Sequence, residues 1–525
     1  MEIIVLKHSK YTKGEEKVSF YTKLINGEIK LVKNLCFLND GQKHKIISFD
    51  FPNILNEIEI NENLIFLDIE QVTKQIIGHS KNEFPKNKKP WSFWSQIWLV
   101  NGEEKREEIN NSRKSYFGLN EQFEQDEINN QFVFLLESTE KIYKKILVEL
   151  IEKNESKRYD ETESFLNTIL FERVKKGINV DTSRIKDYLK EVNLELYALK
   201  NKLQLEYGIF SKTDYHNVKR ELTKILPSIV DKMGTKDYFK MLKYYKEDFT
   251  LINLLFEERK VTTNKTMLSR IGSLDDKRIY PQFQYFGTVT SRILVESPSL
   301  QQLKSSYRDI ILADKDKELI YIDYCQFEAG ILASEADDDN LIEMYNKADI
   351  YSEMNESLKE NPEITREKCK QLFFNYCYGM SPENIKKYSK VDLGVFFKQF
   401  PNLEVFQQKL NESFKDKGFI ETTEGNRRYK NIVNVGTEIE GWLISQRIQG
   451  NASLILKKAI LNVYNLDREI EFLIPMHDAV LYQIPKGKYQ EKKGILEVQF
   501  KKAFKDICPK IIPKVDFKEF CVKKL

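Results

Sequence analysis

The stretch that most constrains this chain is residues 366–379, which read REKCKQLFFNYCYG. A cation or an aromatic ring recurs there at every fourth position: Arg366, Lys370, Phe374 and Tyr378. Four residues turn an α-helix by roughly 400°, so the spacing predicts a helix with these side chains in one stripe. Two cations can hold a triphosphate, and a neighbouring ring can stack on the attached base. A surface helix with solvated charges and core-packed rings is the alternative.

Composition narrows the classes that the chain can belong to. Of its 525 residues, 41% are hydrophobic and 31% are charged, which is typical of a soluble globular protein with several domains. No apolar run reaches the roughly 18 residues of a membrane span, so we expect no membrane partner. The six cysteines form no CxxC pair and there are only five histidines, which argues against zinc. Any metal is therefore expected to be a hard cation held by carboxylates.

Residues 1–150 are predicted to form a small α/β domain. Short β-like runs alternate there with the turn signals Asn26-Gly27 and Asp40-Gly41. The apolar strand 64–67 is followed by Asp68-Ile-Glu70, and an Asp-x-Glu triplet after a buried strand is how two-metal 3′–5′ exonucleases begin. No convincing acidic partners follow, so we expect a degenerate exonuclease-like or unrelated domain without exonuclease activity. A nuclease that uses Asp68 and Glu70 remains an alternative.

The aromatic residues that follow a basic loop at 81–89 allow two interpretations. Charge beside stacked rings could bind a single strand, or the rings could pack a core. These rings are Trp91, Phe93, Trp94 and Trp98.

From about 143 to 259 the apolar residues recur at helical spacing. Within this region, Gly177 is expected to end one helix, and Asp181 or Thr182 is expected to be the N-cap of the next.

Two acidic residues are predicted to stand at the ends of strands in the C-terminal half. Residues 319–324 alternate as a strand does and carry Asp323 near its end. Residues 472–484 read as two apolar strands around His477-Asp478, which places Asp478 at a hairpin tip. Pro475 in the first of these strands predicts a sheet edge or a bulge.

Four motifs, in this order, resemble those of the family A DNA polymerases, the bacterial polymerase I and T-odd phage type. They are DYCQFE at 323–328, REKCKQLFFNYCYG at 366–379, RIQGNAS at 447–453 and MHDAV at 476–480. Upstream, TVTSR and SPSLQQL are similar to further segments of the family. The resemblance covers about 165–525 and leaves out residues 1–150.

The resemblance implies an α+β fold, the right-hand polymerase, with an antiparallel palm sheet and helical fingers and thumb. The expected divisions are a thumb at 151–280, a palm at 281–345 and 430–525, and fingers at 346–429, after the small α/β domain at 1–150.

The resemblance also implies roles for individual residues. Asp323 and Asp478 would hold two Mg²⁺ ions, with Mn²⁺ possible in their place, and would be the catalytic pair. The dNTP would be bound by residues of three motifs: Gln326, Glu328, Arg366, Lys370, Phe374, Tyr378 and His477. Arg292 and Gln449 would contact the minor groove of the duplex, where acceptors are shared by all correct base pairs.

One of these residues sets the choice of sugar. In the family, a Glu at the position of Glu328 packs against the fingers Tyr and blocks a 2′-hydroxyl, so Glu328 with Tyr378 favours deoxynucleotides. The chain departs from the family pattern at Ala479, where an auxiliary carboxylate is usual, and also at Ser291, Gly441 and Ser445. Metal affinity and primer contacts are expected to differ accordingly.

We therefore expect a template-directed DNA polymerase that acts on primer-template DNA and dNTPs. One alternative is atypical or untemplated synthesis that serves a mobile element, a phage or a defence system. Another is an inactive nucleic-acid-binding protein. The cysteine pattern favours a reducing compartment, hence a cytoplasmic, nucleoid-associated protein or a phage protein in its host's cytoplasm. The sequence does not indicate an accessory protein partner.

Overall fold

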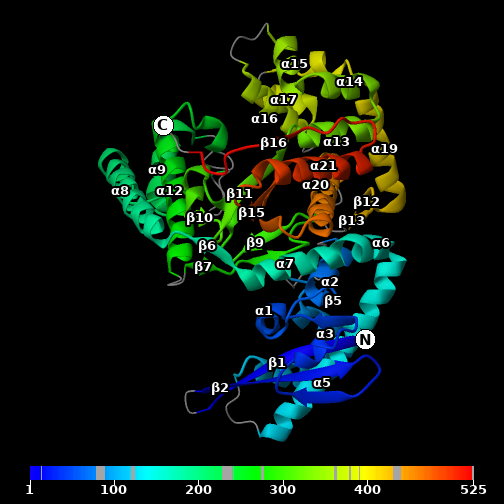
Figure 1. The fold of residues 1–525 in the computed structure, drawn as a ribbon. Coiled ribbons are helices and arrows are strands. Elements are labelled where there is room, and N and C mark those ends of the chain that lie inside the picture. The colour runs from blue at the N-terminus through cyan, green and yellow to red at the C-terminus, as the bar shows by residue number, and fades with distance from the viewer. Residues whose placement is uncertain are drawn as a thin grey trace. The chain divides into compact units, whose positions relative to one another are not determined.

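The computed structural model describes the chain except for residues 13–14, 79–88, 120–123, 228–238, 240–241, 274–276, 360–363, 378–379, 390, 430–438 and 523–525. The chain divides into two compact units. The first comprises Met1–Lys176, Gln282–Leu294 and Asp316–Lys518, and the second comprises Gly177–Pro281, Val295–Lys315 and Glu519–Leu525. Figure 1 shows the helices and strands of both units.

The first unit begins with a five-stranded sheet in the order β3-β2-β1-β4-β5. The strands are β1 (Glu2–Thr12), β2 (Glu15–Leu24), β3 (Ile29–Val32), β4 (His44–Ser48) and β5 (Leu64–Asp68). β1 and β2 are antiparallel, whereas β4 runs parallel to both β1 and β5. The parallel pairs need crossover connections: the chain passes from β1 to β4 through β2 and β3, and from β4 to β5 through short helical segments. The predicted α/β character of this region is confirmed.

Helices cover this sheet because its inward side chains are apolar (Figure 1). They are α1 (Phe51–Ile54), α2 (Ile69–Ile77), α3 (Phe93–Asn101), α4 (Arg106–Tyr116) and the long α5 (Gln125–Glu152). The expected aromatic cluster belongs largely to this packing, since Phe93 is fully buried and stacks on Phe49 with ring centroids 3.7 Å apart. The basic loop at 81–89 lies outside the described residues except for Lys89.

The part of the first unit that is expected to be the palm contains a four-stranded sheet in the order β14-β15-β11-β16. Its strands are β11 (Lys317–Tyr324), β14 (Glu471–Met476), β15 (Ala479–Pro485) and β16 (Val515–Phe517), and the pairs β11·β15, β14·β15 and β11·β16 are antiparallel. β14 is an edge strand with a register shift between Phe472 and Ile474, which confirms the expectation from Pro475.

Helices α13 (Phe327–Ala336), α20 (Ile439–Leu466) and α21 (Tyr489–Ile507) pack around this sheet. Tyr324 of β11 lies between Phe500 and Phe504 of α21, with centroid distances of 5.2 and 5.6 Å. α21 therefore covers the face of the sheet that carries the buried residues of β11.

The hairpin β12 (Phe419–Thr422) and β13 (Gly425–Tyr429) packs against α20. The two come so close at Gly450 that a Cβ atom there would lie 2.3 Å from Cγ2 of Thr422.

Smaller helices make up the part of the chain expected to be the fingers. They are α14 (Asp339–Lys347), α15 (Ile350–Ser357), α16 (Arg366–Cys377), α17 (Pro382–Ser389), α18 (Gly394–Phe397) and α19 (Pro401–Lys417). Two helices link the N-terminal sheet to the rest of the unit, α6 (Ser156–Arg158) and α7 (Ser164–Lys176), with the π-helical turn η4 (Tyr159–Glu163) between them. Strand β8 (Gln282–Gln284) also belongs to this unit.

The second unit is mainly helical. It contains α8 (Thr182–Tyr207), α9 (Tyr215–Ile225), α12 (Thr250–Gly272) and the sheet β10-β6-β7, formed by Ile311–Leu312, Ile178–Val180 and Arg278–Ile279, while β9 (Leu294–Glu296) straddles its boundary. Apolar residues of the three helices form one core. The predicted N-cap is confirmed, because the Asp181 carboxylate accepts hydrogen bonds from the backbone N–H groups of Ser183 and Arg184.

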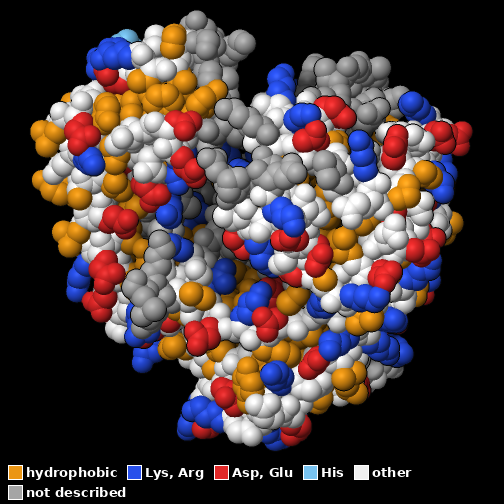
Figure 2. All heavy atoms as spheres, turned by 90° about the horizontal axis from the view of Figure 1, so that it is seen from above, with side chains coloured by type: hydrophobic (Ala, Val, Ile, Leu, Met, Phe, Trp, Pro, Cys, Tyr) orange, Lys and Arg blue, Asp and Glu red, His pale blue; other side chains and the backbone are white. Residues whose placement is uncertain are grey.

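Within the described part of the chain, no helix is both long enough and apolar enough to span a membrane. Figure 2 shows acidic and basic side chains interspersed over one face of the molecule, in keeping with the formal net charge of +3. Binding of a polyanion would therefore depend on local clusters of cations rather than on the net charge.

Candidate functional site

Asp323 and Asp478 lie side by side at one end of the palm sheet. Asp323 of β11 stands opposite Ala479 of β15, and Asp478 is the residue before Ala479. The backbone N–H of Tyr324 donates to the carbonyl oxygen of Asp478 at 3.2 Å. The strand register thus brings together the two carboxylates that the sequence places at strand ends.

The charges around Asp478 confirm this proximity. Burial raises the pKa of Asp478, and the negative charge of Asp323 adds to the increase. The positive charges of Arg292, His477 and Lys370 oppose it. Three cationic side chains therefore lie within electrostatic reach of the carboxylate pair, and they come from three separate motifs of the sequence.

Lys518 is a site residue that the sequence did not indicate. Its ammonium group donates to Oδ2 of Asp323 at 2.6 Å. The contact joins residues 195 positions apart in the chain. Lys518 lies in a tail with scattered lysines and belongs to no recognisable sequence motif. It is placed beside Asp323 because β16, which it follows directly, pairs with β11.

The donor set at this end of the sheet fits a hard divalent cation. Carboxylate oxygens are the ligands that Mg²⁺ and Mn²⁺ prefer, and Asp323 and Asp478 present them from adjacent strands. Ala479, where the resemblance places an auxiliary acid, is buried and offers no ligand atom.

The predicted helix over 366–379 is present as α16, and its first cation is already paired. The guanidinium of Arg366 donates to both carboxylate oxygens of Asp349, at 3.1 and 2.7 Å. It also lies 5.5 Å from the ring centroid of Tyr351. Asp349 is the N-cap of α15, so the side chain that caps the start of one helix also holds the first residue of α16. The sequence alone did not indicate this partner.

The remaining residues of the stripe differ in exposure. Lys370 is exposed to solvent, and Phe374 is half-buried with its ring 6.1 Å from that of Tyr351. Tyr378 lies outside the described residues. Lys370 is exposed, and its charge acts electrostatically on Asp478.

Two residues that follow β11 are fixed by hydrogen bonds. The Gln326 side chain accepts a hydrogen bond from the backbone N–H of Ile350 at 2.9 Å, and its backbone has a left-handed φ of 52°. Glu328 is 1% exposed, and its Oε1 accepts a hydrogen bond from Arg292 at 2.8 Å. The Arg292–Glu328 ion pair joins two residues for which the family resemblance implies separate roles.

The other two candidates lie on α20 and in the β14–β15 turn. Gln449 is half-buried on α20, next to the close approach of Gly450 to the β12–β13 hairpin. His477 is exposed and has a φ of 59°, as expected at the first position of a two-residue turn between paired strands.

Asp68 and Glu70 make structural hydrogen bonds in the N-terminal domain. Asp68 is the N-cap of α2, where its carboxylate accepts from the N–H groups of Glu70 and Gln71 at 2.9 and 3.1 Å. Glu70 accepts from the N–H of Phe93 at 2.8 Å. Burial and the charge of Glu70 raise the pKa of Asp68 to about 7.

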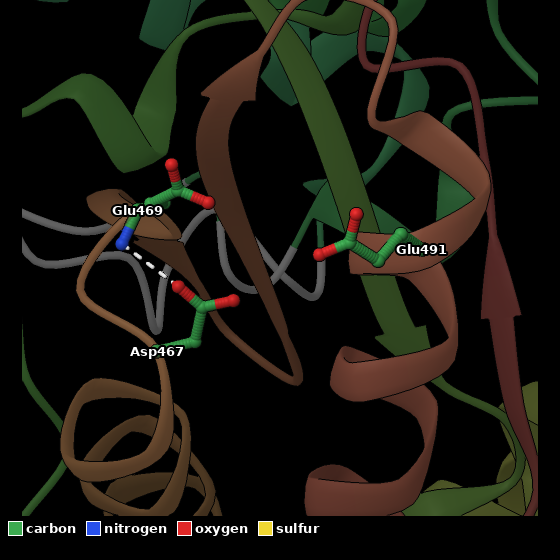
Figure 3. Close-up of side chains that lie close together, drawn as sticks. All are labelled: Asp467, Glu469 and Glu491. Atoms are coloured by element: carbon green, nitrogen blue, oxygen red, sulfur yellow. Dashed lines mark hydrogen bonds between the residues drawn. The ribbon is translucent and has the colours of Figure 1, made fainter.

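Among the residues that the structure describes, one acidic trio has carboxylate oxygens within 4.8 Å of one another: Asp467, Glu469 and Glu491 (Figure 3). It lies at the end of α20 and the start of α21. Lys492 places its ammonium 2.8, 2.6 and 3.0 Å from these three carboxylates. Hydrogen bonds from Lys492 and Lys488 lower the pKa of Glu469 to about 2. Lys492 contacts all three carboxylates of the trio, whereas Lys518 contacts only the Asp323 carboxylate of the pair, so Asp323 and Asp478 are the better candidate metal site.

Comparison with known proteins places the chain in a family. The model of DNA polymerase family A matches residues 168–517, and the chain belongs to that family.

Three curated relatives are similar in sequence to this chain. DNA polymerase I of Caldicellulosiruptor bescii is 24% identical over 417 residues, which cover 71% of this chain and 48% of that protein. DNA polymerase I of Aquifex aeolicus is 24% identical, and the match covers 65% of this chain and 63% of that protein. DNA polymerase I of Bacillus subtilis is also 24% identical, and the match covers 66% of this chain and 44% of that protein. The chain thus spans less than two thirds of the length of these relatives.

A solved structure shares the fold. It is the POL domain of Pol1 from M. smegmatis in complex with DNA primer-template and dNTP, with a TM-score of 0.74 and 17% sequence identity. The match covers 98% of this chain and 94% of that chain, so it extends into the residues before 168 that the family model does not reach. The expected fold class, a right-hand α+β polymerase with a small N-terminal α/β region, is confirmed.

Proposed function

We propose that this protein is a DNA polymerase that adds dNTPs to the 3′ end of a primer under the direction of a template. The observation that supports this most strongly is the placement of Asp323 beside Asp478, with Lys370 of α16 within electrostatic reach. Family membership and the DNA and dNTP bound in the similar POL domain point the same way.

Two divalent cations, Mg²⁺ or Mn²⁺, would be held by Asp323 and Asp478 and, when bound, would activate the primer hydroxyl and stabilise the leaving pyrophosphate. The carboxylates must be ionised to do so. Arg292, His477 and Lys370 lower the pKa of Asp478 and so favour its charged form against the effect of burial.

The incoming triphosphate would be bound by the cations of α16. Lys370 is exposed and can reach a phosphate directly, whereas Arg366 must leave Asp349 or share its guanidinium with it. Since a bidentate pair is a specific geometry, Asp349 holds Arg366 in a defined orientation before the nucleotide arrives. Phe374 and Tyr378 would stack near the base, and Gln326 would line the same pocket.

The choice of sugar would depend on Glu328. Because it is buried and bonded to Arg292, it forms a fixed wall rather than a mobile side chain. A 2′-hydroxyl would meet this wall, whereas a deoxyribose would not. Arg292 would orient Glu328 and, with Gln449, contact the minor groove of the primer-template duplex.

Primer extension by the full chain tests the proposal. A labelled primer is annealed to a template and supplied with each dNTP alone and then with all four. When each dNTP is supplied alone, we expect only the one complementary to the first unpaired template base to be added. Full extension should require all four dNTPs. Asp478→Asn should abolish extension while DNA binding, measured by fluorescence anisotropy, is retained and weakens with added salt.

Two outcomes would replace this function with another. Extension that ignores the template base, or proceeds on a primer without a template, would indicate untemplated synthesis. DNA binding without extension under any dNTP or metal condition, unchanged in Asp478→Asn, would indicate a binding protein. Digestion of a labelled single strand, with Asp68→Ala as the control, tests separately for an exonuclease.

A further inference from the structure

The side chain of Lys518 reaches a carboxylate that the proposed reaction needs for metal. Its ammonium lies 2.6 Å from Oδ2 of Asp323, a distance typical of a short charge-assisted hydrogen bond. The Asp323 side chain is 21% exposed and that of Lys518 is 48% exposed, so the pair lies at the surface of the sheet and not in its core. A divalent cation that binds Asp323 must compete with this ammonium group.

The alternation of the strands defines the face on which this contact lies. In β11, Ile320, Ile322 and Tyr324 are buried beneath α21, so Asp323 points to the opposite face. In β16, Phe517 lies on the α21 side, where Lys493 approaches its ring to 5.0 Å. The residues on either side of Phe517 therefore point to the face that carries Asp323.

A second carboxylate stands next to Lys518 on this face. Asp516 is paired directly with Asp323 across the β11–β16 ladder, and directly opposed residues place their side chains on the same face about 5 Å apart. Asp516 is exposed. Asp516 stands two positions before Lys518, so strand alternation places both side chains on this face and the ammonium has two acidic neighbours, Asp323 and Asp516.

On the β15 side of Asp323, the directly opposed residue is uncharged. Its partner on β15 is Ala479, which is buried and has no charge. The carboxylate of Asp516 is not close enough to both Asp323 and Asp478 for the three to hold one metal ion. Among the described residues, only Asp467, Glu469 and Glu491 form such a trio. Asp516 is therefore placed to bind the ammonium rather than to share the metal.

We propose that Lys518 is an internal cation that occupies the Asp323 carboxylate until a divalent cation arrives, and that Asp516 then receives the displaced ammonium. The ammonium moves from one residue of a cross-strand pair to the other, so both carboxylates have a cationic partner once the divalent cation is bound. This inference rests on the proposed function, because it takes Asp323 as a metal ligand. It assigns to Lys518 control of metal affinity and to Asp516 a positioning role.

The test measures the binding of Mn²⁺ to the full chain without DNA or nucleotide. Binding is monitored in electron paramagnetic resonance as the loss of the signal of the free ion. Lys518→Met should lower the Mn²⁺ dissociation constant about five- to tenfold, because the competing charge is gone. Asp516→Asn should raise it about threefold, because the ammonium has lost its second partner. In the double variant, Asp516→Asn should have no further effect, because the ammonium that it would receive is absent. The Mn²⁺ dissociation constant of the double variant should therefore equal that of Lys518→Met.

Lys493→Met is the matched control. It removes a lysine charge near β16 from the other face of the sheet, so the Mn²⁺ affinity should stay at the parent value. Thermal unfolding in chelator provides a second measurement. Lys518→Met should unfold at a lower temperature than the parent without metal, because Asp323 and Asp478 then repel each other unshielded. Added Mn²⁺ should raise its melting temperature by more than that of the parent.

The possible results separate the inference from the function on which it rests. Mn²⁺ affinity that is unchanged in Asp323→Asn would overturn the metal site itself. If Asp323→Asn weakens binding but Lys518→Met does not strengthen it, the metal site stands and the role of Lys518 is wrong. Asp516→Asn could also weaken Mn²⁺ binding equally in the parent chain and in Lys518→Met. Asp516 would then act on the metal directly, and the proposed transfer of the ammonium from Asp323 to Asp516 would be wrong.

Discussion

Arg292 and Glu328 form an ion pair that determines how both can act. Glu328 is buried and its Oε1 lies 2.8 Å from the Arg292 guanidinium, so neither side chain is free to change position alone. A buried carboxylate held by one strong hydrogen bond is rigid, and rigidity is what a steric filter for a sugar requires. The sequence indicates both residues but not that they bind each other.

Glu328→Ala tests the sugar filter. Removing the side chain opens the space for a 2′-hydroxyl, so the ratio of kcat/KM for a dNTP to that for the matching rNTP should fall by about tenfold or more. Single-turnover incorporation of the two nucleotides gives this ratio. Glu328→Gln is the control, because it keeps the size of the side chain and should keep most of the discrimination. An unchanged ratio in Glu328→Ala would remove Glu328 from this role.

Asp68 makes the stability of the N-terminal domain depend on pH. Its ordinary pKa of 3.8 is raised to about 7 in the fold by burial and by Glu70. Between these values the folded state binds more protons than the unfolded state, so the contribution of Asp68 to stability falls as pH rises from about 4 to 7. One pKa unit corresponds to about 1.4 kcal/mol, so the whole change amounts to a few kcal/mol.

Asp68→Asn should remove this dependence, because asparagine can cap α2 without ionising. We expect its melting temperature to equal that of the parent near pH 4.5 and to exceed it by a margin that grows up to about pH 7. Thermal unfolding by circular dichroism at several pH values measures the difference. A difference that is constant across pH would contradict the assigned ionisation.

At the scale of elements, the contact between α20 and the β12–β13 hairpin positions Gln449. It depends on Gly450, because a methyl group there would meet Cγ2 of Thr422 at 2.3 Å. The Thr422 hydroxyl donates to the carbonyl oxygen of Gly425 and accepts from Arg158, so the hairpin cannot easily move away. The motif Gln449-Gly450 thus combines a candidate DNA contact with the packing that holds it.

Gly450→Ala should destabilise the chain by about 1–3 kcal/mol and reduce primer extension, because overpacking shifts α20. Urea denaturation measures the first effect. Adding Thr422→Ser removes Cγ2 but keeps the hydroxyl, so the double variant should regain much of the loss. Gly494→Ala on α21 is the control, since nothing lies within 4 Å of its added Cβ. Equal losses in Gly450→Ala and Gly494→Ala would show that the contact is unimportant.

At the scale of the whole molecule, buried charges connect the N-terminal part of the first unit to the palm. Glu163 accepts hydrogen bonds from Arg158 at 2.9 Å and from Lys457 of α20 at 2.8 and 2.7 Å, and the side chains of all three are fully buried. Burial lowers the pKa of Lys457 to about 8. Two buried cations therefore share one buried carboxylate.

Glu163→Gln should destabilise the chain by about 3–5 kcal/mol, because it removes the carboxylate that two buried cations share. Lys457→Met should cost far less, since the pair of Arg158 and Glu163 stays neutral. Denaturation monitored by circular dichroism compares the two variants. If both variants lost the same stability, volume rather than charge would explain the effect.

The sequence by itself determined the elements that carry the chemistry and the order of the motifs. The spacing of residues 366–379 specified a helix, the alternation of 319–324 placed Asp323 near a strand end, and the turn at His477-Asp478 placed the second carboxylate. These inferences succeed because periodicity and turn chemistry act over a few neighbouring residues.

Only the tertiary structure decided which charges meet. The partners of the predicted site residues come from distant parts of the chain: Lys518 for Asp323, Asp349 for Arg366 and Arg292 for Glu328. Lys518 and Asp323 are 195 positions apart, and they meet because β16 pairs with β11 in one particular register. Register depends on the packing of whole strands and helices against one another, and no local pattern of residues contains that information.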